Sequence, residues 1–193
     1  MSNAVLTIVL GGLSAMSLAV GASLGNTTNS SAYSSNATFV SAEFKDEVQA
    51  EVATKFTDEQ RQDYFYLAAT MWGEARGEGK TGMGYVGHVI MNRAATGFRG
   101  TTPTEVALYH KQFSCWNQND PNREKLNIEY LENHSTSEER EAWNSAKTLA
   151  YYIINGSADY TGGALHYHAK SVNPNWSSDY TVTAVQGSHI FYR

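Results

Sequence analysis

TDEQRQDYFYLAATMWGEARGE, residues 57–78, is the stretch around which the rest of the chain is arranged. Thr57 and Gln60 have the spacing of a capping box, and Asp58 and Glu59 place negative charge in the first turn, where the helix dipole favours it. Apolar residues then recur at helical spacing, at Tyr64, Leu67, Ala68 and Met71. The stretch therefore predicts a helix that begins after Thr57 and turns one face into a core.

Glu74 continues this apolar face at the end of the predicted helix. A carboxyl group placed there loses contact with water, which favours its protonated form and suits it to act as a general acid. The glycines on either side predict a tight loop that another segment approaches closely. The alternative is a structural carboxylate paired with Arg76 or Arg93, because ion pairs also occupy such glutamates.

Length and charge limit the classes of protein that the sequence can encode. A chain of 193 residues, 41% of them hydrophobic, can bury one sizeable core but hardly two. The formal net charge is -5, and the 14 Lys and Arg residues form no basic run, so we expect no nucleic-acid partner.

Cys115 is the single cysteine, which excludes an intramolecular disulfide and a CxxC metal site. It lies between Phe113 and Trp116, so we expect it to pack as a small hydrophobic residue; the alternative is a catalytic thiol paired with a histidine. The surrounding loop, residues 111–117, mixes polar and aromatic side chains, a composition typical of carbohydrate clefts.

The N-terminal part differs in composition from the rest. Residues 4–25 carry no charge and are about long enough to cross a bilayer, which predicts a signal or anchor segment over 1–25 and contact with a membrane. The alternative is a buried helix of a larger assembly. Residues 26–56 are predicted as a flexible linker with an amphipathic lead-in, and 57–193 as the folded domain that carries the candidate site. We therefore expect an exported protein of the cell envelope.

Further helices are predicted after the glutamate loop. The helical period recurs to Gly97, and Thr102 with Pro103 starts a short helix. Ser137 is the expected N-cap of a long helix that ends before Gly156.

Three short segments at the end of the chain have strand character, at residues 164–168, 180–185 and 189–192. In the first of them, His166 and His168 share one face and Tyr167 takes the other. Helices followed by a small antiparallel sheet indicate an α+β fold.

Six short motifs occur in order along residues 58–193. They are WGEARGE (72–78), HVIMNRA (88–94), QFSCW (112–116), TGGALHYH (161–168), NPNW (173–176) and HIFYR (189–193). In this order they resemble the SleB-type cell-wall hydrolases, a family that includes spore-cortex-lytic enzymes of bacilli and many phage relatives.

The resemblance implies a lysozyme-like α+β domain that cleaves peptidoglycan glycan strands as a lytic transglycosylase, with Glu74 as catalytic acid and base and with no metal or cofactor. The bond would be the one between N-acetylmuramic acid and N-acetylglucosamine. Motif position makes six further residues candidates for the substrate cleft, and Glu78 a structural or substrate-orienting residue. The six are Gln112, Ser114, Trp116, Thr161, Tyr167 and His168.

Four alternatives remain open at this point. Muramidase-type hydrolysis would need a second carboxylate. A zinc amidase or peptidase could use His166, His168 and His189 as ligands. A wall-binding or virion-structural module would keep the fold without turnover. The resemblance makes 57–193 a peptidoglycan-cleaving catalytic domain and the membrane contacted by 1–25 the bacterial inner membrane. The biological setting is predicted as phage-induced host lysis, with bacterial cell-wall remodelling as the second possibility.

Overall fold

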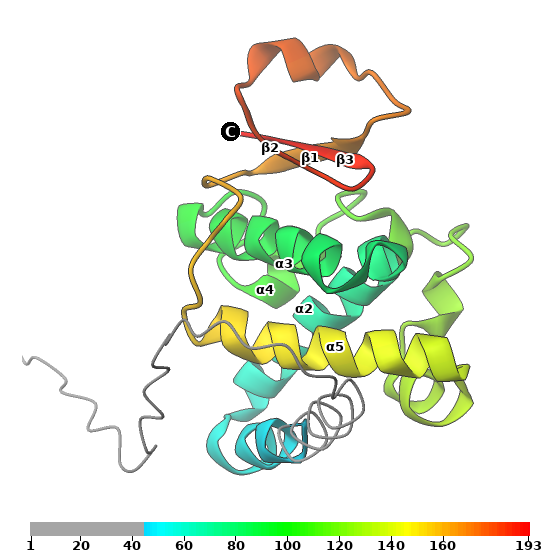
Figure 1. The fold of residues 1–193 in the computed structure, drawn as a ribbon. Helices are drawn as coiled ribbons and strands as arrows, with labels where there is room; N and C mark the ends of the chain where they lie inside the picture. Colours follow the sequence, from blue (N-terminus) through cyan, green and yellow to red (C-terminus); the bar gives the residue numbers. More distant parts are fainter. Residues whose placement is uncertain (1–44) are drawn as a thin grey trace, which may run out of the picture.

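The computed structural model describes residues 45–193, and the predicted segment 1–25 and most of the predicted linker lie outside this range. A helical body carries a small antiparallel sheet at one end, next to the C-terminus (Figure 1). The α+β prediction is confirmed. The helices are α2 (Asp58–Ala75), α3 (Gly79–Thr96), α4 (Pro103–Leu108) and α5 (Ser137–Ile154), and the strands are β1 (His166–Ala169), β2 (Val182–Gln186) and β3 (His189–Tyr192).

Short helical turns connect these elements. They are the 3-10 turns η1 (Arg76–Glu78), η2 (Ser114–Trp116), η3 (Arg123–Lys125) and η5 (Asn175–Asp179), and the π-helical turn η4 (Tyr130–His134).

Helix α2 begins as the sequence predicts. The hydroxyl of Thr57 accepts a hydrogen bond from the backbone N–H of Gln60 at 3.2 Å, and the Gln60 side chain accepts one from the Thr57 N–H at 2.9 Å. The capping box satisfies two N–H groups that a helix start leaves free. On the inward face of α2, Leu67 and Met71 are completely buried.

The predicted N-cap of α5 is wrong by one residue. The cap is Thr136, whose hydroxyl accepts from the N–H of Glu139, while the Glu139 side chain accepts from the Thr136 N–H. Ser137 is the first residue of the helix. The Thr-x-x-Glu pair forms a complete capping box, whereas Ser137 has no acidic partner three residues on, so Thr136 takes the cap.

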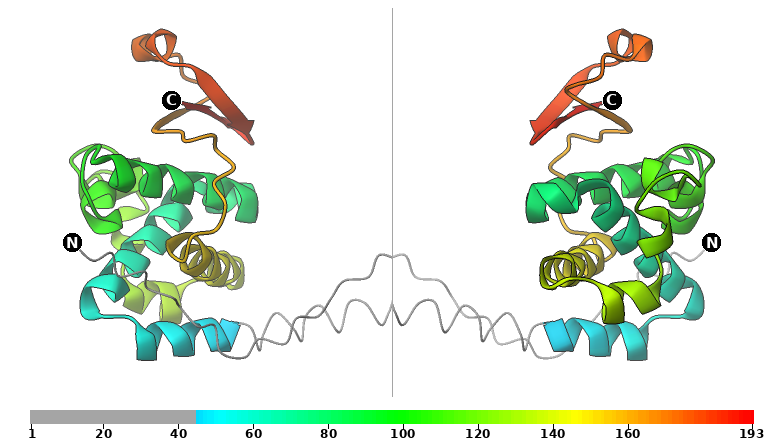
Figure 2. Two further views of the ribbon diagram at one scale, coloured as in Figure 1. Left: turned by 90° about the vertical axis from the view of Figure 1, so that its left-hand side faces the viewer. Right: turned by 90° about the vertical axis from the view of Figure 1, so that its right-hand side faces the viewer.

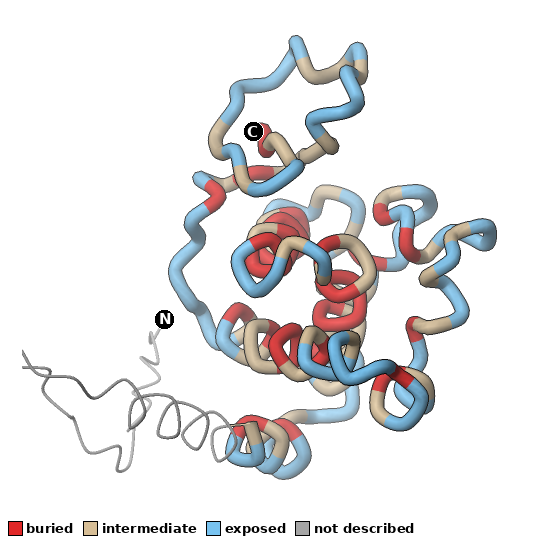
Figure 3. Tube along the Cα trace, turned by 45° about the vertical axis from the view of Figure 1, so that its right-hand side comes forward, coloured by how far each residue is buried: buried red, intermediate tan, exposed pale blue. Residues whose placement is uncertain are grey.

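One core unites α2, α3 and α5, and the buried positions gather where these helices cross (Figure 3). The largest buried side chains include Trp72, Met83, Ile90 and Trp143. Residues 45–55 form a further helix, and its Val52 joins the same core. Gln49 of this helix donates to the Tyr64 hydroxyl at 2.9 Å. The helix therefore packs on the body, and the domain boundary near residue 56 stays a prediction.

The sheet has the strand order β1-β3-β2 and lies on α3 (Figures 1 and 2). Tyr167 pairs with Phe191 in the register of β1 and β3, and Phe191 packs in a small core with Val89 of α3. Tyr167 therefore points toward the helices. His166 lies on the opposite face, where it contacts Trp176 of η5.

Among the described residues 45–193, no helix is both long and apolar enough to cross a membrane.

Replacing Thr136 by alanine is expected to lower the free energy of unfolding by about 1 kcal/mol, because the capping box of α5 is lost. Ser137→Ala is the matched control and should change it by less than about 0.5 kcal/mol. Denaturant unfolding of both variants measures the difference. A larger loss for Ser137→Ala would show that the helix is capped one residue later.

Candidate active site

Glu74 lies in the last turn of α2, half-buried, and its carboxylate accepts three hydrogen bonds. Oε1 accepts from the backbone N–H of Cys115 at 2.8 Å and from the Ser114 hydroxyl at 3.1 Å. Oε2 accepts from the Tyr167 hydroxyl at 2.9 Å. The donors come from η2 and β1, far away in sequence, so the tertiary fold holds the orientation of this carboxyl group.

Gly73 allows η2 to approach α2 closely enough for these contacts. A Cβ atom built on Gly73 would lie 2.7 Å from Cβ of Cys115, closer than two carbon atoms tolerate. The expectation that a second segment closely approaches the glycines around Glu74 is thus confirmed for Gly73.

Cys115 is buried in the core, as predicted, rather than presented as a nucleophile. Burial and the adjacent Glu74 carboxylate raise the pKa of its thiol, so the thiolate that nucleophilic catalysis requires is disfavoured. Its contribution to the site is its backbone N–H.

Tyr167 connects the sheet to the glutamate. Its ring stacks on Phe191 with centroids 5.5 Å apart. Burial, and then the neighbouring Glu74 carboxylate, raise the pKa of the phenol well above its ordinary value. The phenol therefore keeps its proton and remains a donor to Glu74 across the neutral pH range.

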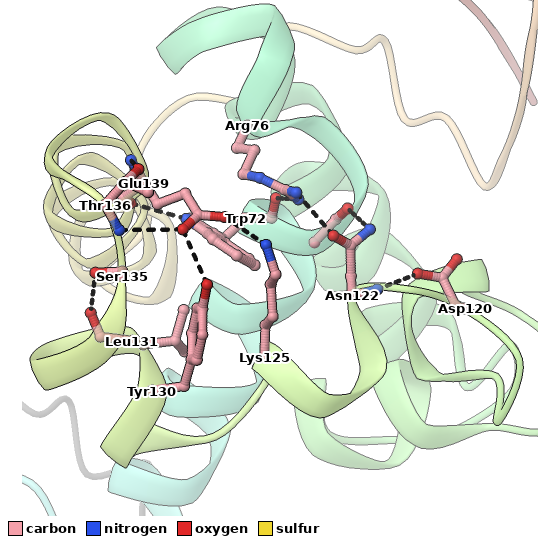
Figure 4. Close-up of polar contacts among 11 residues, drawn as sticks. Trp72, Arg76, Asp120, Asn122, Lys125, Tyr130, Leu131, Ser135, Thr136 and Glu139 are labelled. Carbon is pink, nitrogen blue, oxygen red and sulfur yellow. Dashed lines mark hydrogen bonds and ion pairs between the residues drawn. The ribbon is translucent and has the colours of Figure 1, made fainter.

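The alternative in which Glu74 pairs with an arginine is not what the structure shows. Arg76 donates to the Asn122 side chain at 2.7 Å and lies over the Trp72 ring, 4.1 Å from its centroid (Figure 4). Arg93 donates to the backbone oxygen of Leu165 at 2.7 Å. Within residues 45–193, no ion pair includes Glu74.

A second polar network fixes the region beside the end of α2 (Figure 4). The Glu139 carboxylate accepts from Lys125 at 2.8 Å and from the Tyr130 hydroxyl at 3.1 Å, and the Glu139 backbone oxygen accepts from the Trp72 indole at 3.0 Å. The network ties the segment after η2 to both α2 and α5, so it supports the turn of α2 that carries Glu74.

Glu78 has a different environment from Glu74. Its Oε1 accepts hydrogen bonds from the backbone N–H of Ser188, at 3.1 Å, and from the Ser188 hydroxyl, and lies 2.9 Å from Nδ1 of His189. Burial would raise the pKa of this carboxyl group, but the contacts with Ser188 and His189 together lower it below its ordinary value. Glu78 thus joins η1 to the turn between β2 and β3, and a substrate-orienting role for it stays a prediction.

A cavity of about 430 Å³ lies next to the glutamate cluster. Tyr167 belongs to both, because it lines the cavity and donates to Glu74. Of the predicted cleft residues, Gln112 and Tyr167 line this cavity. Lys111 of the predicted carbohydrate-cleft loop also lines it. The other lining residues, which motif position did not assign to the substrate cleft, are Arg93, Phe98, Arg99, His166, Trp176 and Tyr180.

The remaining predicted cleft residues are placed elsewhere or differently. Ser114 reaches Glu74 itself. The Trp116 indole donates to the Thr70 hydroxyl at 2.9 Å and packs against the core. Thr161 is fully buried and donates to Asp159 at 2.7 Å.

His168 lies 2.7 Å from the Tyr192 hydroxyl, and its ring is near Trp176. Like Trp116 and Thr161, it does not line the cavity. A role of these three residues toward substrate stays a prediction.

The three histidines of the zinc alternative do not converge. His166 and His168 point to the face of the sheet that η5 covers. His189 lies on the other face, against Tyr167 and Glu78. A single metal ion cannot be bound from both faces of a sheet by these rings.

Comparison with known proteins assigns the chain to a family. The sequence model of a family described as Cell Wall Hydrolase matches residues 77–192. The chain belongs to the cell wall hydrolase family. The matched range begins just after Glu74 and includes η2, Tyr167 and Glu78. This cell wall hydrolase is therefore an enzyme, and the resemblance to the SleB-type family is confirmed.

Two solved structures share the fold of this cell wall hydrolase. The catalytic domain of the germination-specific lytic transglycosylase SleB from Bacillus anthracis is 23% identical, with a TM-score of 0.51, and the match covers 72% of this chain and 98% of that one. The catalytic domain of Bacillus cereus SleB is 23% identical, with a TM-score of 0.54, and covers 72% and 94%. No curated protein matches the sequence.

Tyr167→Phe is expected to reduce the rate of cell-wall clearing about tenfold or more, because hydrogen bonds to charged groups contribute about 1.5–3 kcal/mol. The ring, and so the packing on Phe191, is retained. Tyr151→Phe removes a hydroxyl that donates to Glu51 instead, away from the site, and is the matched control. Turbidity loss of purified sacculi measures both, and equal rates for the two variants would contradict a role of Tyr167 at Glu74.

Proposed function

We propose that this cell wall hydrolase cleaves the glycan strands of peptidoglycan between N-acetylmuramic acid and N-acetylglucosamine, as a lytic transglycosylase that uses Glu74 alone. The observation that supports this most strongly is the convergence of three donors on Glu74 beside a cavity with aromatic walls. Aromatic rings in a cleft suit the apolar faces of sugars.

In the first step, protonated Glu74 gives its proton to the glycosidic oxygen while the bond from that oxygen to C1 of the muramic acid breaks. The positive charge develops at C1 as an oxocarbenium-like state. The carboxylate left on Glu74 is stabilised by the N–H of Cys115 and the hydroxyls of Ser114 and Tyr167, which already point at it.

In the second step, the Glu74 carboxylate takes the proton of the C6 hydroxyl of the same sugar, and the C6 oxygen bonds to C1. The product is a 1,6-anhydro ring, and Glu74 is protonated again. Every proton and bond is accounted for with one carboxyl group and no water.

The surroundings of Glu78 favour this route over muramidase-type hydrolysis. Hydrolysis needs a second carboxylate across the sugar, about 5–9 Å from the first, to act as nucleophile or to activate water. Oε1 of Glu78 is held by Ser188 and His189, and Glu78 does not line the cavity. No described residue that lines the cavity carries a carboxylate. The solved relative from Bacillus anthracis is described as a lytic transglycosylase, which agrees with the proposal.

Glu74→Gln is expected to reduce peptidoglycan cleavage by about 1000-fold, because the general acid and base is lost while the shape of the side chain is kept. Glu78→Gln should retain far more cleavage activity than Glu74→Gln when both are assayed at low temperature. Its melting temperature should fall instead, because the substitution weakens the contact between η1 and the turn that joins β2 and β3. Cleavage assays with thermal unfolding of both variants separate the two effects. A Glu74→Gln protein that clears walls at the normal rate would refute the proposal.

Product analysis tests the reaction type. Mass spectrometry of the fragments released from peptidoglycan should show anhydro-muramic ends, which are lighter by one water than reducing ends. Reducing muramic ends would instead indicate hydrolysis and a second catalytic group.

We propose phage-induced host lysis as the setting, with export through the apolar segment 1–25 and attachment to the inner membrane; bacterial wall remodelling is the second candidate. The support is the sequence of this segment. Fractionation of cells that express the full chain, followed by N-terminal sequencing, tests the export: the protein should be in the envelope fraction, and recovery of the uncleaved chain from the cytosol alone would refute it.

A further inference from the structure

The cavity beside Tyr167 is rich in positive charge. Arg93, Arg99 and Lys111 line it together with rings of Trp176 and Tyr180, and the described lining residues include no carboxylate. A hollow that combines several cations with aromatic walls suits an organic anion rather than a neutral sugar alone.

Arg93 supplies a buried cation at this cavity. Only 5% of the residue is exposed. Its Nε donates to the backbone oxygen of Leu165 at 2.7 Å and its Nη1 to the Gln112 side chain at 3.5 Å, both of them neutral acceptors. Burying an arginine without an anion is costly, so the charge is available to an incoming one.

Arg99 and Lys111 share an unusual backbone. They have φ angles of 71° and 58°, and within residues 45–193 they are the two non-glycine residues with positive φ. Left-handed backbone is unfavourable for such side chains and is concentrated at ligand sites, where the surrounding fold holds it. Both residues line the same cavity. Arg99 also lines the neighbouring hollow, where its Nη1 donates to the Tyr109 hydroxyl at 3.5 Å.

The three charges are not neutralised by the protein itself. Among the described residues, none of the three cations forms an ion pair with a carboxylate. Burial, followed by the charges of Arg93 and Arg99, lowers the pKa of His166 at the same cavity. The field in the hollow is therefore positive.

We propose that this cavity is a subsite for the carboxylate carried by the O3 substituent of N-acetylmuramic acid. The inference rests on the proposed function, which places the muramic acid at Glu74, and Tyr167 links that position to the cavity. In a glycan strand that bears peptides, the carboxylates belong to the stem peptide. In a glycan strand without peptides, the carboxylate belongs to the lactyl group. The shared chemistry is a carboxylate next to the sugar that is cleaved, a feature that chitin lacks.

Binding to the inactive full chain tests the subsite apart from catalysis. In the Glu74→Gln background, Arg99→Asn and Lys111→Asn are combined, because asparagine tolerates the left-handed backbone of both positions. Arg140→Gln removes an exposed cation of α5 and is the matched control. Three probes are compared: a tetrasaccharide of alternating N-acetylglucosamine and N-acetylmuramic acid with stem peptides, the same glycan with free lactyl groups, and neutral chitotetraose. Isothermal titration calorimetry measures the affinity of each variant for each probe.

The double variant is expected to bind a carboxylate-bearing probe about tenfold more weakly and to lose much of the salt dependence of that binding, with chitotetraose unaffected. A loss confined to the peptide-bearing or to the lactyl probe supports the subsite and identifies which carboxylate it takes. Equal effects on all three probes, or no effect, would overturn the subsite. Wall cleavage by the Glu74→Gln protein would overturn the catalytic proposal instead, and the binding result for the subsite would still hold.

Discussion

The carboxyl group of Glu74 is held by hydrogen bonds from two segments that are distant from it in sequence, and the rest of the molecule makes this possible. The 3-10 turn η2 provides the Cys115 N–H and the Ser114 hydroxyl, and β1 provides Tyr167. The turn reaches α2 because position 73 has no side chain. The strand reaches it because the sheet is packed on α3 through Phe191 and Val89.

The placement of the sheet depends on a second glutamate of the same motif. Glu78 accepts hydrogen bonds from Ser188 in the turn between β2 and β3, and Gly187 in this turn has a φ of 54° and lies so near the carboxylate that a Cβ atom there would be 2.4 Å from Oε2. The two glutamates of WGEARGE therefore have different roles. Glu78 connects the sheet to the helices, and the sheet positions the Tyr167 hydroxyl at Glu74.

Local signals in the sequence predicted the fold class, α2, the Gly97 helix end and the two faces of β1, because capping boxes, glycine stops and strand alternation are decided within a few residues. Thr136 and Ser137 are adjacent residues that both favour N-cap positions, and Glu139, three residues after Thr136, decides between them because it completes the capping box. The resemblance singled out Glu74, Gln112, Ser114 and Tyr167, and the structure places these four residues in one region, while their roles in catalysis and substrate binding stay predictions. The cavity itself could not be predicted, because Arg93, Lys111 and Trp176 meet only through tertiary packing, and the left-handed backbone of Arg99 and Lys111 has no signature in those residue types.

We propose that Glu74 contacts the glycosidic oxygen while Tyr167 and η2 hold the carboxyl group of Glu74 in place. The most direct measurement is a crystal structure of the Glu74→Gln protein with a peptidoglycan tetrasaccharide bound. We expect the side-chain amide introduced at position 74 to lie within hydrogen-bond distance of the oxygen between N-acetylmuramic acid and N-acetylglucosamine, with the muramic acid beside Tyr167. A glycan bound only in the neighbouring hollow lined by Glu105 and Tyr109, with the side chain at position 74 out of reach of any glycosidic oxygen, would contradict this proposal.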